Sequence, residues 1–221
     1  MTDRALIICA GDATRWGNYT GVPKHLVEIE GERLLDRTCR QLWERDHNII
    51  TKVVVKNTTP SEYDTMWSER EVADLHPEYG NMDKFLSSKS LWSKDGRTIV
   101  LYGDVWFSDF AMDTIMDFKG RGMWLFCRPS RSHYTGCEWG ECFAQSFYPE
   151  NLEDHERILH ECSADSRFSS GGWGWYRKMA GIDASETVLG GNAVTIDDFT
   201  EDFDFPKDLD MWLKNRAEKQ E

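Results

Sequence analysis

The sequence is short of positive charge for its size. Lysine and arginine number 26 against 39 aspartates and glutamates, which leaves a net charge of −13. This balance argues against broad electrostatic capture of nucleic acid or of an anionic membrane, because such binding depends on the neutralisation of phosphates by lysine and arginine. It still permits a local basic groove, and it is compatible with carboxylates gathered around a metal ion.

Long apolar runs and paired cysteines are also missing from the sequence. No stretch approaches the roughly 18 apolar residues of a membrane-spanning helix, and the apolar run near the first residue is too short for a signal peptide. The six cysteines form no C-x-x-C pair and no zinc-finger spacing. We therefore expect a reduced, cytoplasmic protein with free thiols and no membrane association.

The chain does contain an alternation of strand-like and helix-like segments, without an internal repeat. With 221 residues, of which 40% are hydrophobic, it is long enough for one domain with a substantial core. The alternation predicts an α/β fold with a mostly parallel sheet. Strands are expected at 5–10, 25–29, 52–55, 98–102, 123–127, 141–147 and 187–196, and helices at 34–44, 83–92, 110–118, 152–162 and 206–216.

A glycine-containing loop follows the first expected strand. A loop between a strand and a helix presents backbone N–H groups to a phosphate, and glycine removes the Cβ atom that would block the approach. Arg15 and Lys24 add cationic donors for a polyphosphate. We therefore predict a nucleotide phosphate site here. The residues expected at the phosphates are Ala10, Gly11, Asp12, Ala13, Thr14, Arg15 and Lys24.

Two acidic positions stand where a metal ion would be useful. Gly103-Asp104 follows the strand expected at 98–102, and the carboxyl ends of strands are the edge at which open α/β sheets bind ligands. Asp202 and Asp204 precede the proline that is expected to open the last helix. Carboxylates suit Mg²⁺ (or Mn²⁺), because a hard cation takes oxygen ligands and bridges phosphate oxygens. A turn cap and a solvated acidic face are the alternative interpretations.

These segments together resemble the signature of the sugar-phosphate nucleotidyltransferases and their molybdopterin-nucleotide relatives. Two positions depart from the family pattern, Ala13 in place of a glycine and Arg33 in place of a proline. The resemblance implies a three-layer α/β/α, Rossmann-like sandwich with a mostly parallel sheet, which this family shares with glycosyltransferases of the A type. The matching strings are Ala10-Gly11-x-x-Thr14-Arg15, Pro23-Lys24-x-Leu26, Gly31, Leu34-Leu35-x-Arg37-Thr38, Gly103-Asp104 and Asp202-Phe203-Asp204-Phe205-Pro206-Lys207-Asp208-Leu209.

The resemblance also implies roles for particular residues. Asp104 and Asp204 would hold the metal, with Asp202 in support or in place of Asp204. The catalytic set would be Arg15, Lys24 and Asp104, with the two cations neutralising phosphate charge. Residues 1–118 would form the nucleotide-binding half of a single domain, and residues 119–221 the acceptor-binding half.

The base and the acceptor are expected at three further segments. In the family, a glycine-containing segment reads the base, which points to Asn81 and Lys84, with Gly103 beside the nucleotide; a helix cap explains Asn81 equally well. Residues 119–133 carry five basic or histidine side chains and no acid, and residues 170–178 interleave aromatic side chains with glycines and cations. A surface loop and a core helix are the alternatives for these two segments. The acceptor-binding candidates are Arg128, Arg131, Trp173 and Trp175.

These observations favour a metal-dependent nucleotidyltransferase. A phosphorylated acceptor such as a sugar phosphate would attack the α-phosphate of a nucleoside triphosphate and expel pyrophosphate. The alternative is a glycosyltransferase of the same fold, which takes a sugar from a nucleotide-sugar to an acceptor, conceivably hydroxymethylated cytosine in phage DNA. A nucleotide sensor without catalysis is a third possibility. The sequence does not indicate the oligomeric state.

Overall fold

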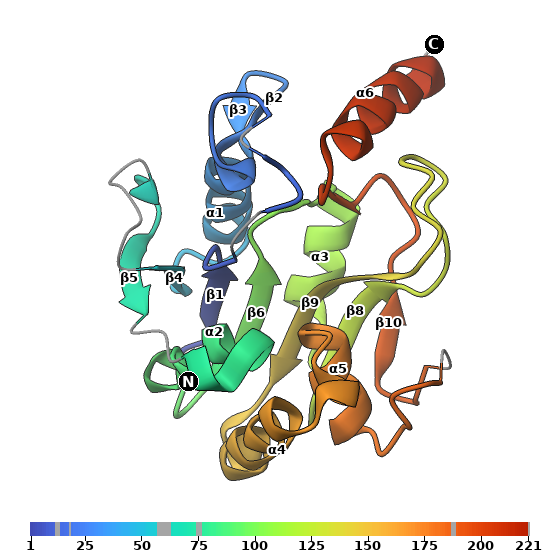
Figure 1. The fold of residues 1–221 in the computed structure, drawn as a ribbon. Helices are drawn as coiled ribbons and strands as arrows, with labels where there is room; N and C mark the ends of the chain where they lie inside the picture. Colours follow the sequence, from blue (N-terminus) through green and yellow to red (C-terminus); the bar gives the residue numbers. More distant parts are fainter. Residues whose placement is uncertain (12–13, 18, 57–62, 74–76, 187–188, 221) are drawn as a thin grey trace.

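A seven-stranded sheet forms the centre of the computed structural model, which describes residues 1–11, 14–17, 19–56, 63–73, 77–186 and 189–220 (Figure 1). The strand order is β10-β8-β9-β6-β1-β4-β5. β9 is antiparallel to β6 and β8, and the other neighbouring strands pair in parallel, which confirms the mostly parallel sheet. The strands are β1 (Arg4–Ile8), β4 (Ile50–Lys56), β5 (Glu69–Ala73), β6 (Thr98–Tyr102), β8 (Trp124–Arg128), β9 (Glu141–Phe147) and β10 (Ala193–Thr195).

Helices cover both faces of the sheet (Figure 1). Within β1, Ala5 and Ile7 join the core beneath α1 (Leu34–Arg45) and α3 (Asp109–Asp117). Leu6 and Ile8 join the opposite core, which is shared with α2 (Asp83–Leu86), α4 (Leu152–Ala164) and α5 (Gly172–Met179). Both faces of β1 are therefore buried, as its uninterrupted apolar sequence predicts. The three-layer α/β/α sandwich is confirmed.

A third, smaller core lies beneath the last helix, α6 (Pro206–Gln220). There the buried Trp212 packs against Trp106 and Phe203, with ring centroids 4.9 and 5.6 Å away. The short strand β11 (Glu201–Asp202) pairs in antiparallel fashion with β7 (Val105–Trp106), and the hairpin of β2 (Glu28–Ile29) and β3 (Glu32–Arg33) adds Ile29 to the same core. This packing brings the segment before α6, residues 201–204, beside Asp104.

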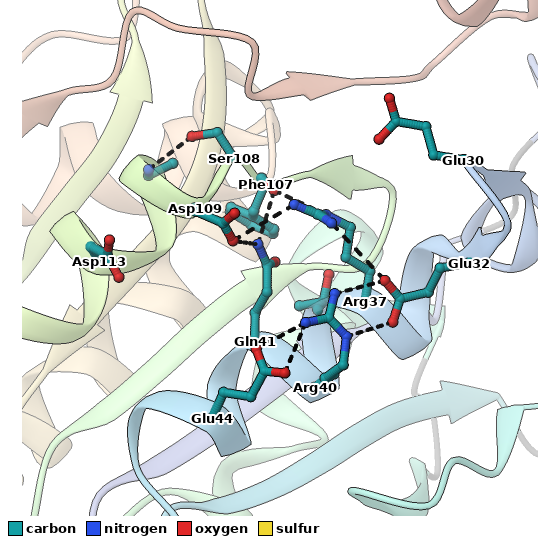
Figure 2. A network of polar contacts seen from close by, with 12 residues as sticks. Glu30, Glu32, Arg37, Arg40, Gln41, Glu44, Phe107, Ser108, Asp109 and Asp113 are labelled. Atoms are coloured by element: carbon teal, nitrogen blue, oxygen red, sulfur yellow. Dashed lines mark hydrogen bonds and ion pairs between the residues drawn. The ribbon is translucent and has the colours of Figure 1, made fainter.

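Polar contacts fix the segment that follows Asp104 to helix α1 (Figure 2). The carbonyl oxygen of Phe107 accepts hydrogen bonds from Arg37 Nε at 3.4 Å and from Gln41 Nε2 at 3.3 Å. Gln41 also donates to the carboxylate of Asp109 at 2.9 Å, and the Ser108 hydroxyl caps α3 by accepting from the amide of Ala111. The segment from Phe107 to Asp109, which follows the carboxyl end of β6, is thereby fixed by side chains of α1 and by the first turn of α3.

Three expected elements differ from the structure. Residues 25–29 form the 3₁₀ turn η1 (Lys24–Leu26) before the two-residue β2, so the expected strand is mostly wrong. The helix expected at 83–92 ends at Leu86, where Ser87 donates back to Asp83 and Ser88 to the Phe85 carbonyl, bonds that compete with helix propagation. Of the strand expected at 187–196 only β10 forms, and positions 187–188 lie outside the described residues.

Further 3₁₀ turns occur at η3 (Pro77–Met82), η4 (Lys89–Leu91), η5 (Pro149–Asn151) and η6 (Ser166–Phe168). The last helix does begin at Pro206, as expected for a residue that lacks an amide hydrogen and suits a first turn. Among the described residues, no helix combines the length and the apolar character needed to cross a membrane.

Candidate active site

A polar cleft of about 400 Å³ opens at the carboxyl ends of β1 and β6, next to the first residues of β9. This is the edge at which open α/β sheets bind ligands. The cleft brings together candidates from the whole length of the described chain. Of the residues singled out in the sequence, those that line it are Gly11, Thr14, Arg15, Lys24, Asn81, Lys84, Asp104, Trp173, Asp202 and Asp204.

Three carboxylates converge on one point of the cleft. One oxygen atom from each of Asp104, Asp202 and Asp204 lies within 4.8 Å of the other two. The pairing of β11 with β7 produces this convergence, because it sets Asp202 opposite Val105, and the amide of Phe203 donates to the Asp104 carbonyl at 3.2 Å. Neighbouring carboxylates in this arrangement are the ligands that a hard divalent cation prefers.

Two cations from the phosphate loop contact the same carboxylates. The ammonium of Lys24 forms ion pairs with Asp104 and, at 3.2 Å, with Asp204, and its side chain is only 7% exposed. The guanidinium of Arg15 lies 2.6 Å from Asp204 but is half-exposed. The predicted phosphate-binding cations therefore lie directly beside the predicted metal ligands, at opposite ends of the described sequence.

The three carboxyl groups titrate differently because their surroundings differ. Burial works to raise the pKa of Asp104, but the neighbouring positive charges, that of Lys24 first, and a hydrogen bond from Lys24 together outweigh it and lower that pKa to about 2. Burial and the charge of Asp104 raise the pKa of Asp202 well above its ordinary value. One oxygen of Asp202 is buried without a hydrogen-bond partner among the described residues. A divalent cation would satisfy this oxygen and compensate its charge, so the site fits a metal.

Gly103 is required by the close approach of two strands. Its amide donates to the carbonyl of Ile8 at 3.1 Å, and a Cβ atom placed on it would lie 2.3 Å from the sulfur of Cys9. Any larger residue would push the chain away from the end of β1. The glycine of the Gly-Asp motif therefore sets the position of Asp104, and it contributes no side chain to the cleft.

The structure describes most of the phosphate loop. Gly11 and Thr14 are exposed at the cleft, Ala10 is buried behind its wall, and Asp12 and Ala13 lie outside the described residues. Buried Trp16 anchors the loop by donating from its indole nitrogen to the Val22 carbonyl at 3.2 Å. Because Ala13 is outside the described residues, the effect of this departure from the family pattern on the loop stays a question of sequence alone.

Asn81 links two segments of the cleft wall. Its side-chain amide donates to the carbonyl of Ser169 at 2.7 Å, which joins η3 to the loop before α5. Lys84, one helical turn further along the chain, points its ammonium over the rings of Phe85 and Tyr102, at 5.4 and 5.8 Å from their centroids. Burial lowers the pKa of Lys84 below its ordinary value.

The four acceptor-binding candidates are scattered in the structure. Trp173 lines the cleft. Trp175 is fully buried, where it packs against Phe85 in the core. Arg128 is also buried, and its guanidinium forms an ion pair with Glu201 at 2.6 Å. The exposed Arg131 lies outside the cleft lining. The geometry therefore brings only Trp173 together with the predicted nucleotide and metal residues.

The sequence analysis did not identify several residues that line the cleft. Glu141 and Cys142 begin β9, and this strand runs opposite to its neighbours, so its first residues reach the edge where the others end. Burial raises the pKa of Glu141 to about 7, and the nearby charge of Asp204 adds to this shift. Only the strand direction, which the sequence does not reveal, would have indicated these two positions. The other missed residues are Ile8, His25 and Tyr102, whereas Ser170, Gly171 and Gly172 belong to the expected segment 170–178.

His25 is a buried neighbour of the carboxylates. Its Nδ1 lies 2.9 Å from the hydroxyl of Tyr63, and burial lowers its pKa to about 4. The ring is therefore neutral at physiological pH and supports the packing behind Asp104 without adding charge.

Comparison with known proteins identifies the fold. No protein-family model matches the chain, and no curated protein matches its sequence. Among solved structures, it is similar to the CTP:phosphocholine cytidylyltransferase of Streptococcus pneumoniae, with 14% identity, a TM-score of 0.64 and 100% of both chains covered. It is also similar to the inositol-1-phosphate CTP transferase of T. maritima, with 15% identity, a TM-score of 0.66 and coverage of 98% of this chain and 95% of the other.

A third similar structure is described as a glucose-1-phosphate thymidylyltransferase from Bacillus anthracis, with 12% identity and a TM-score of 0.66 over 97% of this chain and 95% of that one. Sequence identities at this level establish the fold alone. The chain has the fold of the nucleotidyltransferases, as its motifs predict.

Proposed function

We propose that this protein is a metal-dependent nucleotidyltransferase, which joins a nucleoside monophosphate from a nucleoside triphosphate to a phosphorylated acceptor and releases pyrophosphate. The observation that carries the proposal is the convergence of three carboxylates with Arg15 and Lys24 in one cleft of this fold. The names of the three similar structures support it, because phosphocholine, inositol 1-phosphate and glucose 1-phosphate are all phosphate monoesters.

The triphosphate would lie against the loop that follows β1. Gly11 and Thr14 present exposed backbone at the cleft, and Arg15 and Lys24 supply the charge that a polyphosphate requires. Both cations are held by carboxylates in the structure, so nucleotide binding would transfer them from carboxylate to phosphate. Asn81, which joins η3 to the loop before α5, also lines the cleft and would contact the base.

Mg²⁺ (or Mn²⁺) would be held by Asp104 and Asp204, with Asp202 as a third oxygen donor. When bound, such a cation neutralises phosphate charge and orients the triphosphate. The residues of the chain would supply the remaining requirements: Arg15 and Lys24 stabilise the charge that accumulates on the phosphate oxygens. An oxygen of the acceptor's phosphate forms a bond to the α-phosphorus, and the bond to the pyrophosphate oxygen breaks with its electron pair. Positioning and electrostatics provide most of the rate in such transfers.

Release of pyrophosphate is the test of this function. Each common nucleoside triphosphate would be incubated with Mg²⁺ and a panel of phosphate monoesters, and pyrophosphate would be measured enzymatically. We expect pyrophosphate release with at least one combination. In Asp104→Asn, the rate of this release should fall by about a hundredfold or more. Asp113→Asn is the matched control, because its carboxylate pairs with Arg45 on the surface of α3, away from the cleft.

Two other results would contradict the proposal. Sugar transfer from a nucleotide-sugar without pyrophosphate release would establish the glycosyltransferase alternative, which the ring of Trp173 at the cleft wall could serve. Nucleotide binding without any turnover would indicate a sensor.

A further inference from the structure

Lys84 is the one cation lining the cleft that has no carboxylate partner in the described part of the chain. Arg15 and Lys24 both form ion pairs with the metal-site carboxylates. Lys84 is half-buried and rests on the rings of Phe85 and Tyr102. Asp104 and Asp202 are its neighbouring opposite charges, and it forms an ion pair with neither. A charged group held in a cleft without a counter-ion is a place for an anion to bind.

The start of helix α5 lies against the same aromatic ring. A Cβ atom on Gly172 would lie 1.8 Å from the hydroxyl of Tyr102 and 2.9 Å from the sulfur of Cys142, so only glycine permits this contact. Gln145 holds the helix start in place by donating to the carbonyl of Gly172 at 2.7 Å. The first amides of a helix lack intrahelical acceptors and carry a partial positive charge, and no acidic residue occupies the first turn of α5.

Lys84 and the helix start lie in the part of the cleft that Tyr102 and Cys142 form. They adjoin Tyr102 at the end of β6 and Cys142 at the start of β9, whereas Arg15 and Lys24 follow β1. The metal-site carboxylates contact the phosphate-loop cations directly. The cleft therefore carries a further cation toward β9, and this cation shares Asp104 and Asp202 with Lys24 as neighbouring charges.

We propose that Lys84 and the first amides of α5 form the subsite for the phosphate of the acceptor, which makes the acceptor a phosphate monoester. This inference rests on the proposed function and specifies its second substrate. The bound monoester directs one phosphate oxygen at the α-phosphorus, where the new P–O bond forms as pyrophosphate leaves with the electrons of the broken bond. A hydroxyl acceptor has no charge for Lys84 to bind. Lys84 is then a residue of the acceptor site, in place of the base-reading role that the sequence suggests for it.

The test uses the full chain with Mg²⁺ and a non-hydrolysable analogue of each nucleoside triphosphate, the tightest of which is kept. Methyl phosphate, as a minimal monoester, is then titrated into this complex and its affinity is measured by calorimetry. We expect binding in the wild type, a loss of about tenfold or more in Lys84→Met, and retention of most affinity in Lys84→Arg. Nucleotide affinity should change by less than about twofold in both variants.

Lys89→Met is the matched control, since Lys89 is exposed on the next turn and pairs with Glu156 outside the cleft. It should leave methyl phosphate binding unchanged. Folding of the variants is checked by thermal unfolding, and Lys84→Gln replaces Lys84→Met if the latter does not fold.

Two outcomes overturn the subsite while leaving the proposed function intact. One is a loss of nucleotide affinity in Lys84→Met with methyl phosphate binding unchanged, which would place Lys84 at the nucleotide. The other is a wild-type nucleotide complex that binds no methyl phosphate. Failure of every nucleotide analogue to bind would contradict the proposed function itself, and the subsite with it.

Discussion

Lys24 pairs with Asp104 and lies 3.2 Å from Asp204, so that one buried ammonium serves both of the carboxylates assigned to the metal. Burial alone would lower the pKa of Lys24, but the surrounding carboxylates raise it above its ordinary value, which keeps the side chain charged. In the absence of nucleotide, therefore, a metal ion at the proposed site would compete with Lys24 for these carboxylates. A triphosphate that attracts Lys24 would release these oxygens to the metal.

This competition predicts that Lys24→Met binds metal more readily without nucleotide. The variant should unfold at a lower temperature than the wild type in metal-free buffer, because two half-buried carboxylates lose a counter-ion. Mn²⁺ alone should restore its stability, with an affinity about tenfold or more tighter than that of the wild type. Thermal unfolding against Mn²⁺ concentration measures both effects.

Lys207→Met is the control for this measurement, because Lys207 is exposed beside Phe205 and forms no ion pair with the described carboxylates. Equal Mn²⁺ affinity in the wild type and Lys24→Met would show that the ammonium does not compete with the metal.

Removal of the charge at Asp202 and at Asp204 should change the free energy of unfolding in opposite directions. Asp202→Asn should raise the free energy of unfolding by about 1–2 kcal/mol at neutral pH without metal, because the Asp202 carboxyl ionises only at a cost beside Asp104. Asp204→Asn should lower it by a similar amount, since Arg15 and Lys24 lose a partner. Urea unfolding of the two variants measures the difference.

The sign of the Asp202 effect depends on pH in a checkable way. A carboxyl group with a raised folded pKa destabilises the fold as pH rises through its titration range. The gain in Asp202→Asn should therefore vanish in acid, where the carboxyl is protonated in both the folded and the unfolded state. A gain that grows in acid would refute this explanation.

His155 should make the protein sensitive to acid. Its ring is fully buried beside Phe147, with a centroid distance of 4.1 Å, and neither ring nitrogen has a hydrogen-bond partner among the described residues. Burial lowers its pKa to about 3. Between pH 6.5 and pH 3 the His155 ring therefore carries up to one proton more in the unfolded chain than in the folded protein, which contributes a loss of about 1.4 kcal/mol of stability for each pH unit.

Removing this titration should flatten the acid side of the stability curve. His155→Leu should lose that slope of about 1.4 kcal/mol per pH unit, measured by urea unfolding at several pH values below 6.5. His160→Gln, which changes a more exposed histidine on the same helix, should keep the slope of the wild type. The same slope in both variants would show that His155 does not cause the effect.

Arg128 should matter for stability more than for acceptor binding. Its buried guanidinium forms an ion pair with Glu201, whose carboxylate also accepts from Ser132, and Arg128 does not line the cleft. Arg128→Met should cost about 3–5 kcal/mol, because it leaves a buried charge without a partner, and the double variant with Glu201→Met should recover much of the loss. Chemical denaturation measures both variants.

The kinetic result separates the two interpretations of Arg128. If it binds the acceptor, Arg128→Met raises the acceptor KM selectively and the double variant does not restore it. We expect the acceptor KM to stay unchanged instead, while the maximal rate follows the folded fraction.

Much of the fold could be predicted from local sequence patterns, because the spacing of apolar residues depends on which side chains are buried. The apolar run of β1 and the periodic pattern of α1 are direct signatures of a strand buried on both faces and of a helix with one apolar side. The position of Asp104 at the edge of the sheet could be predicted for a similar reason. Gly103, which precedes it, lies so close to the end of β1 that only glycine fits there.

Long-range pairing explains what the sequence did not reveal. The direction of β9, and with it the arrival of Glu141 and Cys142 in the cleft, depends on which strands it lies between. The basic stretch that includes Arg128 suggested an acceptor site because its buried partner, Glu201, is 73 positions away. Charge patterns in a sequence do not show which cations are already neutralised in the fold.

The distribution of the three cleft carboxylates along the chain also sets the order in which the cleft is completed during biosynthesis. Asp104 and Lys24 are translated early, whereas Asp202 and Asp204 emerge only after every strand of the seven-stranded sheet. Lys24, which pairs with Asp104 in the folded protein, is already present in the chain before Asp202 and Asp204 are made. Under the proposed function, a chain interrupted before position 200 would therefore lack two of the three carboxylates that would hold the metal.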